Sequence, residues 1–173
     1  MKKYKLLITD LDGTLIETLS GDTFPKGIWD MKLKLYVFEA IKNYAPDDIL
    51  IISNQGGIEK GFVDKEMFEY KFDYISNALE DYTDISVSAY YCESNNKRNV
   101  NRKPNIGMIK EYMDFIEYMN NDEDEEEKIV YDTILIGDAS GKEGQFSDSD
   151  KKTAENFGCE YMDVDDFVYK YKG

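Results

Sequence analysis

The chain has 173 residues, of which 42% are hydrophobic and 14% aromatic, and this suits a single domain (residues 1–173) with a buried core. It contains no histidine, which excludes a Ser-His-Asp triad, a Cys-His pair and a His-ligated zinc site. The formal net charge of −15 repels nucleic acid at long range and argues against a large nonspecific DNA-binding surface.

Nothing in the sequence indicates a membrane or secreted protein. The longest apolar runs, such as Ile49 to Ile52, are far shorter than the roughly 20 residues that span a bilayer. The first ten residues lack the apolar core of a signal peptide. Cys92 and Cys159 form no CxxC pair and suggest two half-buried thiols rather than a disulfide framework. We therefore expect a soluble, intracellular (cytoplasmic) protein with no membrane partner.

Short apolar runs alternate with segments of helical spacing along the whole chain. The predicted strands are 5–9, 47–52, 85–91, 133–136 and 159–162. The predicted helices are 31–44, 64–82, 104–119, 150–157 and 163–171. Residues 14–29 read as a loop with room for a small hairpin, and 120–128 as an acidic, mobile insertion. This alternation predicts an α/β fold, a doubly wound (Rossmann-like) parallel sheet with helices on both faces.

Polar clusters follow the predicted strands, where such sheets bind their ligands. The first cluster is Asp10-Leu11-Asp12-Gly13-Thr14. Its two carboxylates lie two residues apart and point the same way if the backbone is extended. Such a pair can bind a hard cation or divide the roles of nucleophile and proton donor, although Asp-Gly is also a common turn.

Three further clusters follow later strands. In Ser53-Asn54-Gln55-Gly56-Gly57, a hydroxyl, two amides and backbone N–H groups could cradle a phosphate. Lys103, just before Pro104, could neutralise phosphate oxygens. Asp138 and Asp150 could complete a magnesium site, but Asp150 also suits a helix N-terminus.

These clusters resemble the motifs of the haloacid dehalogenase superfamily of phosphotransferases. Asp10 and Asp12 in DLDGT resemble the first motif, Ser53 the second, Lys103 the third, and Asp138 with Asp150 the fourth. The resemblance implies five strands in the order 3-2-1-4-5. It also implies a capless member, because the span from Ser53 to Lys103 has no room for an inserted domain.

The resemblance also implies roles for individual residues. Asp10 would attack phosphorus and form an aspartyl phosphate, while Asp12 would protonate the leaving oxygen and then activate water. Ser53 and Lys103 would hold phosphate oxygens. Magnesium would be bound by Asp10, by the backbone carbonyl of Asp12 and by Asp138. Asp150 would support the metal site or orient Lys103, with Asp148 as a rival for that role.

A closer resemblance is to the 3′-phosphatase domain of polynucleotide kinase phosphatases. It is carried by Asp10 to Ile16, by NQGGIEKG after Ser53, by RKPNIGM from Arg102, and by residues 137–167 with IGDASGK and FSDSDKKTAENFG. It implies a nucleic-acid 3′ end, DNA or RNA, as the substrate. No GxxxxGK[ST] loop is present in these residues, so we expect no kinase half.

A basic loop, 97–103, could grip a strand end beside the site, or its cations could merely offset nearby acids. Trp29 and Phe24 could stack on a terminal base or belong to the core. The residues expected to contact substrate are Thr14, Asn54, Gln55, Arg98 and Arg102.

Two alternatives stay open. One is a small-molecule phosphatase of the histidinol-phosphate or sugar-bisphosphate type; many of these relatives carry a zinc loop of Cys and His before the third motif, where this chain has only Cys92. The other is a noncatalytic module that binds a partner through its acidic surface. The intact Asp10, Asp12, Lys103 and Asp138 argue against it.

Overall fold

A computed structural model of the whole chain describes all residues except 1, 23–24 and 121–128. Five parallel strands form the central sheet in the order β5-β4-β1-β6-β7. These strands are β1 Lys2–Thr9, β4 Asp48–Asn54, β5 Val87–Cys92, β6 Ile129–Gly137 and β7 Glu160–Asp163. The predicted order 3-2-1-4-5 and the doubly wound fold are confirmed.

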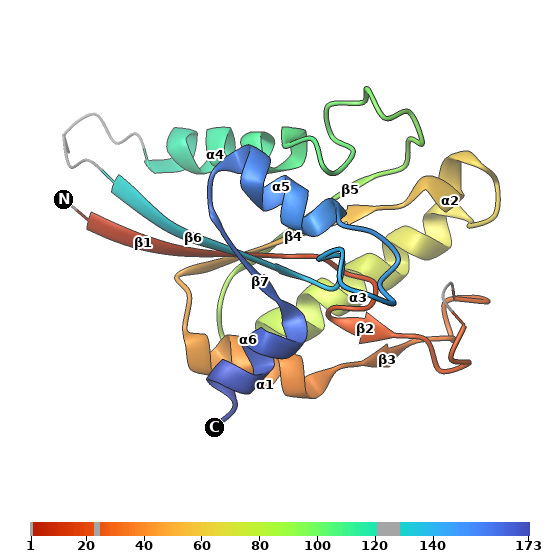
Figure 1. Cartoon of the computed structure of the whole chain (residues 1–173), viewed down its shortest axis with the longest axis horizontal. Helices are drawn as coiled ribbons and strands as arrows, with labels where there is room; N and C mark the ends of the chain where they lie inside the picture. Colours follow the sequence, from red (N-terminus) through yellow and green to blue (C-terminus); the bar gives the residue numbers. More distant parts are fainter. Residues whose placement is uncertain (1, 23–24, 121–128) are drawn as a thin grey trace.

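Helices cover both faces of this sheet, with α4 and α5 on one face and α1, α3 and α6 on the other (Figure 1). Their bounds are α1 Leu35–Tyr44, α2 Gly56–Glu59, α3 Lys65–Thr83, α4 Gly107–Asn120, α5 Ser149–Phe157 and α6 Val164–Tyr171.

The two faces follow from the alternation of side chains along the strands. In β1, Leu7 faces the core that contains Phe38 and Phe72, whereas Leu6 and Ile8 face the core that contains Tyr112. Strands buried on both faces read as continuous apolar runs, which is the pattern seen in the sequence.

The described residues contain no inserted cap domain. After β1, the chain forms a two-stranded antiparallel ribbon, β2 Ile16–Glu17 with β3 Lys32–Leu33, inside the segment predicted as a loop with room for a hairpin. Between β4 and β5 lie only α2 and α3. Among the described residues, no helix is long and apolar enough to cross a membrane.

Several predicted boundaries were wrong. The first predicted helix was expected from Met31, but Lys32–Leu33 pairs with β2 as strand β3, and α1 begins only at Leu35. Strand β1 begins at Lys2 rather than Lys5.

The third predicted helix was expected from Pro104, but α4 begins at Gly107, because the residues before it form turns: Asn105 N donates to Arg102 O at 2.8 Å and Gly107 N to Val100 O at 2.8 Å. Strand β6 begins at Ile129 rather than Thr133, because it pairs with β1 from Lys2 onward. The predicted acidic insertion falls mostly outside the described residues.

Candidate active site

Asp10 and Lys103 meet at the carboxyl edge of the sheet, although 93 positions separate them. Lys103 Nζ lies 2.5 Å from Asp10 Oδ1 and 2.7 Å from Asp150 Oδ1. All three side chains are buried. A buried ammonium needs such partners, since an unpaired charge in the interior is costly.

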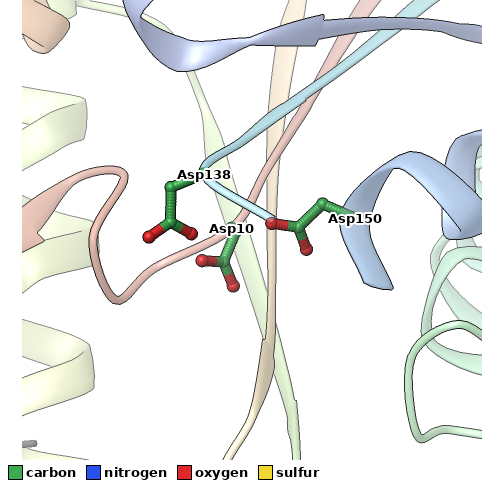
Figure 2. Close-up of side chains that lie close together, drawn as sticks. All are labelled: Asp10, Asp138 and Asp150. Carbon is green, nitrogen blue, oxygen red and sulfur yellow. The ribbon is translucent and has the colours of Figure 1, made fainter. Parts of the chain in front are cut away.

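Asp138 completes a cluster with Asp10 and Asp150. Strands β1 and β6 are paired neighbours, with Thr9 opposite Ile136, so the residues that follow these strands emerge side by side. Figure 2 shows the three carboxyl groups pointing toward one another, from the ends of β1 and β6 and from the start of α5. One oxygen from each lies within 4.8 Å of the other two.

The electrostatics of this cluster favour a bound cation. Burial raises the pKa of Asp10 to about 8 although Lys103 lowers it, and the carboxylates of Asp150 and Asp138 raise it further. Burial, together with Asp150, raises the pKa of Asp138 to about 6. Burial opposes the charge of Lys103, but Asp10 and Asp150 hold its pKa above the usual value. Three carboxylates thus face one ammonium, an excess of negative charge that a divalent cation with oxygen ligands would relieve.

The turn after β1 depends on Gly13. Its φ of 81° lies in the left-handed region, which glycine adopts without strain. A Cβ at this position would also overlap the carboxylate of Asp138. Gly13 therefore lets the turn approach Asp138 closely. Thr14, buried in the same turn, points its Oγ1 at Asp10 Oδ2, 3.4 Å away.

Gln55 joins the first and second motifs. Its Nε2 donates to Asp12 Oδ2 at 2.6 Å and to Ser53 Oγ at 2.8 Å. Ser53 is buried near the end of β4. In the structure Gln55 holds Asp12, a contact that residue type alone does not signal, and its expected contact with substrate stays a prediction.

Asn54 and Arg102 fix the loop that carries Lys103. Asn54 Oδ1 accepts from Lys103 N at 2.9 Å, and Asn54 Nδ2 donates to Lys103 O at 3.1 Å. Arg102 Nη1 donates to the Ser94 carbonyl at 2.8 Å. In the structure these bonds hold the backbone of the loop, and the expected contact of both residues with substrate stays a prediction.

Asp148 and Asp150, the two rivals for a place beside Lys103, have different partners in the structure. Asp148 pairs with Lys152 at 2.7 Å, and nearly half of its side chain is exposed. Asp150 lies in the first turn of α5, fully buried, and accepts from Ala139 N at 3.1 Å as well as from Lys103. Asp150 therefore orients Lys103 while facing the cluster.

Lys34 is a functional candidate that the sequence did not reveal. Its side chain is buried and its Nζ donates to the carbonyl of Gly13 at 2.8 Å. Lys34 is also the residue just before α1, and the first turn of this helix has no acidic residue that could pair with its ammonium group. A cation is unfavourable at a helix N-terminus, so Lys34 is better explained by its contact with the Asp10–Thr14 turn.

The remaining predicted residues lie around the site. Arg98 is exposed and lines a groove beside α4. Trp29 is 67% exposed, so it is not a core residue. Phe24 lies outside the described residues.

Comparisons with solved structures agree with the fold. D,D-heptose 1.7-bisphosphate phosphatase from B. bronchiseptica, solved with magnesium and phosphate, superposes with a TM-score of 0.61 at 21% identity, over 93% of this chain and 79% of that one. The fold is that of the haloacid dehalogenase-like phosphatases.

The sequence defines the family within this class. Residues 5–168 match the family described as Polynucleotide kinase 3 phosphatase, and the chain belongs to it. The bifunctional polynucleotide phosphatase/kinase of Schizosaccharomyces pombe is 31% identical over 96% of this chain, which spans 38% of that protein. The probable D-glycero-D-manno-heptose-1,7-bisphosphate 7-phosphatase of Thermoplasma volcanium is 24% identical, over 83% of this chain and 91% of that protein.

Proposed function

We propose that the chain is a magnesium-dependent phosphomonoesterase that removes 3′-phosphates from DNA or RNA ends through an aspartyl phosphate on Asp10. The observation that carries this proposal is the convergence of Asp10, Lys103, Asp138 and Asp150 at one edge of the sheet. Family membership supports the phosphatase class, and the likeness to the polynucleotide phosphatase/kinase of Schizosaccharomyces pombe supports the polynucleotide substrate.

The residues would share the reaction as follows. A carboxylate oxygen of Asp10 attacks phosphorus, the ester P–O bond breaks, and Asp12 gives its proton to the leaving oxygen. Asp12 then takes a proton from water, which attacks the phosphoryl group and frees Asp10. Splitting the reaction into two displacements lowers the barrier of each. Gln55 keeps Asp12 in place for both.

Ser53, Thr14 and Lys103 would bind the phosphoryl oxygens. The ammonium of Lys103 stays charged and is already fixed by Asp10 and Asp150, so it needs no rearrangement as charge develops. Mg²⁺ held by Asp10, Asp138, the backbone carbonyl of Asp12 and, as a supporting carboxylate, Asp150 would neutralise those oxygens.

A substrate panel tests the proposal. We would measure kcat/KM for a 3′-phosphorylated oligonucleotide, its 5′-phosphorylated isomer, heptose 1,7-bisphosphate and p-nitrophenyl phosphate, with Asp10→Asn as the control. The 3′-phosphate should be preferred, and Asp10→Asn should lose at least about 1,000-fold, since it removes the nucleophile. Activity that survives in Asp10→Asn would contradict the mechanism and support the noncatalytic alternative.

A sugar-bisphosphate phosphatase is the second candidate function. It is favoured by the likeness to the Thermoplasma volcanium protein, which the chain matches over most of both lengths. A preference for heptose bisphosphate in the same panel would favour a sugar-bisphosphate phosphatase over a polynucleotide 3′-phosphatase.

A further inference from the structure

We propose that Tyr161 is a positioning residue that holds the turn carrying Asp138 in the shape that Mg²⁺ requires, and so makes the cluster prefer Mg²⁺ over Ca²⁺. This inference rests on the proposed function, because it concerns the metal of the same site. The Tyr161 hydroxyl contacts the residues on either side of Asp138, and it would act through them.

The Tyr161 hydroxyl bridges two points of one turn. Tyr161 lies in β7, opposite Leu135 of the neighbouring strand β6. Its hydroxyl oxygen lies 3.0 Å from Gly137 O and 2.7 Å from Ser140 Oγ. Gly137 precedes Asp138 directly, and Ser140 follows it two positions later. One phenol therefore ties together the two ends of the turn that carries Asp138.

The available protons fix the direction of these bonds. Burial opposes the charge of Asp163, but the bonds from Ser140 and Gln145 lower its pKa, so at neutral pH it is a carboxylate that only accepts. It accepts from Ser140 Oγ at 2.5 Å, which uses the one proton of that hydroxyl. A backbone carbonyl also only accepts, so the proton of Tyr161 is shared between Gly137 O and Ser140 Oγ. Burial raises the pKa of Tyr161, so the phenol keeps this proton at neutral pH.

Asp150 holds the middle of the same turn. Its Oδ2 accepts from Ala139 N at 3.1 Å. Gly137 lies against this carboxylate, because a Cβ at that position would overlap it. The backbone around Asp138 is thus fixed at the residue before it and at the two residues after it.

Asp138 depends on this backbone more than the other two carboxylates of the cluster do. Asp10 and Asp150 both accept directly from Lys103 Nζ. The carboxylate of Asp138, in contrast, accepts no hydrogen bond from another residue in the described part of the chain. Its place in the cluster is therefore set by the turn from which it extends.

The two ions differ in how much a displaced ligand costs them. Mg²⁺ demands a nearly ideal octahedron with oxygens at about 2.0–2.1 Å, whereas Ca²⁺ accepts irregular sets of oxygens at about 2.3–2.6 Å. A carboxylate that is free to shift should therefore cost Mg²⁺ affinity and leave Ca²⁺ affinity nearly intact. Selectivity between the ions reports positioning, which a general loss of stability would not change.

The test measures metal binding by the full chain in the absence of substrate. The Kd values for Mg²⁺ and Ca²⁺ are obtained from the rise of Tm with MgCl₂ or CaCl₂ at constant ionic strength. Tyr161→Phe keeps the ring and removes only the hydroxyl. We expect it to weaken Mg²⁺ binding about tenfold, as loss of a group that orients a metal ligand does, and Ca²⁺ binding less than about twofold.

Tyr90→Phe is the matched control. Tyr90 is half-buried in the same core as Tyr161, and its hydroxyl forms no hydrogen bond within the described part of the chain. Both of its Kd values should stay within about twofold of those of the unaltered protein. Ser140→Ala keeps the bond from Tyr161 to Gly137 and should weaken Mg²⁺ binding by a smaller factor than Tyr161→Phe, again more than Ca²⁺ binding. It provides the test if Tyr161→Phe does not fold.

An unchanged Kd for Mg²⁺ in Tyr161→Phe, or an equal loss for both ions, would overturn the positioning role. Either result would leave the proposed function untouched, because these measurements involve no substrate. A chain that binds neither ion would overturn both.

Discussion

Two buried lysines, Lys34 and Lys103, place positive charge at the same edge of the sheet, and they differ in their partners. Lys103 is paired with two carboxylates, whereas Lys34 donates to a backbone carbonyl, that of Gly13. The charge of Lys34 also lowers the pKa of Asp138, against the larger effect of burial, which raises it. Lys34 is thus a positioning residue for the turn that carries Asp10 and Asp12.

Lys34→Met keeps the apolar stem and removes the ammonium. We expect kcat for a 3′-phosphate to fall about tenfold, which corresponds to about 1.4 kcal/mol of lost transition-state stabilisation. The unfolding free energy should fall by only about 1 kcal/mol, the usual worth of one hydrogen bond. Steady-state kinetics and urea unfolding would measure the two effects.

Lys32→Met is the matched control, because Lys32 lies two residues earlier with 63% of its side chain exposed and pairs with Glu17. Its activity should stay within twofold of the unaltered protein. If Lys34→Met lost no more activity than Lys32→Met, the positioning role would be wrong. The sequence MKLKL gives no sign of which lysine is buried, and only the fold distinguishes them.

At the scale of elements, the loop between β6 and α5 depends on a carboxylate from another strand. Asp163, at the end of β7, accepts from Ser140 Oγ at 2.5 Å and from Gln145 Nε2 at 2.8 Å. It also caps α6 by accepting from Asp165 N at 3.1 Å. One buried side chain therefore orders both the loop between Asp138 and Asp150 and the start of the last helix.

Asp163→Asn should destabilise the fold by about 1–3 kcal/mol, because an amide replaces a charged acceptor that serves several donors. Burial opposes the ionisation of Asp163, but the bonds from Ser140 and Gln145 prevail and lower its pKa. Its stabilising effect is then fully present above the unfolded value of about 3.9 and is lost as pH falls through the lower folded value. Urea unfolding from pH 7 to pH 3 should show the deficit of the variant shrinking only below about pH 4.

Asp165→Asn serves as the control, since Asp165 is exposed in the first turn of α6 and only its backbone N–H bonds to Asp163. It should change stability by less than about 0.5 kcal/mol. A deficit for Asp163→Asn that stayed constant down to pH 3 would mean that packing, not charge, explains its effect.

Sequence patterns predicted the helices and strands well where the chain is continuously buried. They predicted them poorly where contacts with distant segments determine where an element begins. The runs Leu6–Ile8 and Ile49–Ile52 are apolar because both faces of the sheet are covered, and this made the strands readable. The first residues of β6 are only half-buried, and their pairing with the start of β1 leaves no periodic signal. Likewise, the partners of Gln55 and Asp163 come from other segments, which residue type cannot show.

At the scale of the whole molecule, strand order brings the site together. Because β1 lies between β4 and β6, the residues that follow these three strands share one edge, and Lys103 and Asp150 arrive from the loops and helices beside them. The resemblance to the four motifs of the superfamily predicted that these residues lie close together. The excess of carboxylates over ammonium there leads to an expectation about the stability of the entire fold.

Magnesium should stabilise the folded protein against heat, because it would bind the folded state alone. At a concentration of about 100 times its Kd, the gain is about 2.7 kcal/mol, or roughly 5–10 °C in Tm for a chain of this size. Asp138→Asn should abolish that shift, and its own metal-free Tm should be no lower than that of the unaltered protein, since one of three crowded acids is gone. Differential scanning calorimetry at ionic strength matched with KCl separates specific binding from general screening of the −15 charge. Asp148→Asn, which alters a carboxylate paired with Lys152 outside the cluster, should keep the full shift, and an equal shift in Asp138→Asn would place the bound cation somewhere else.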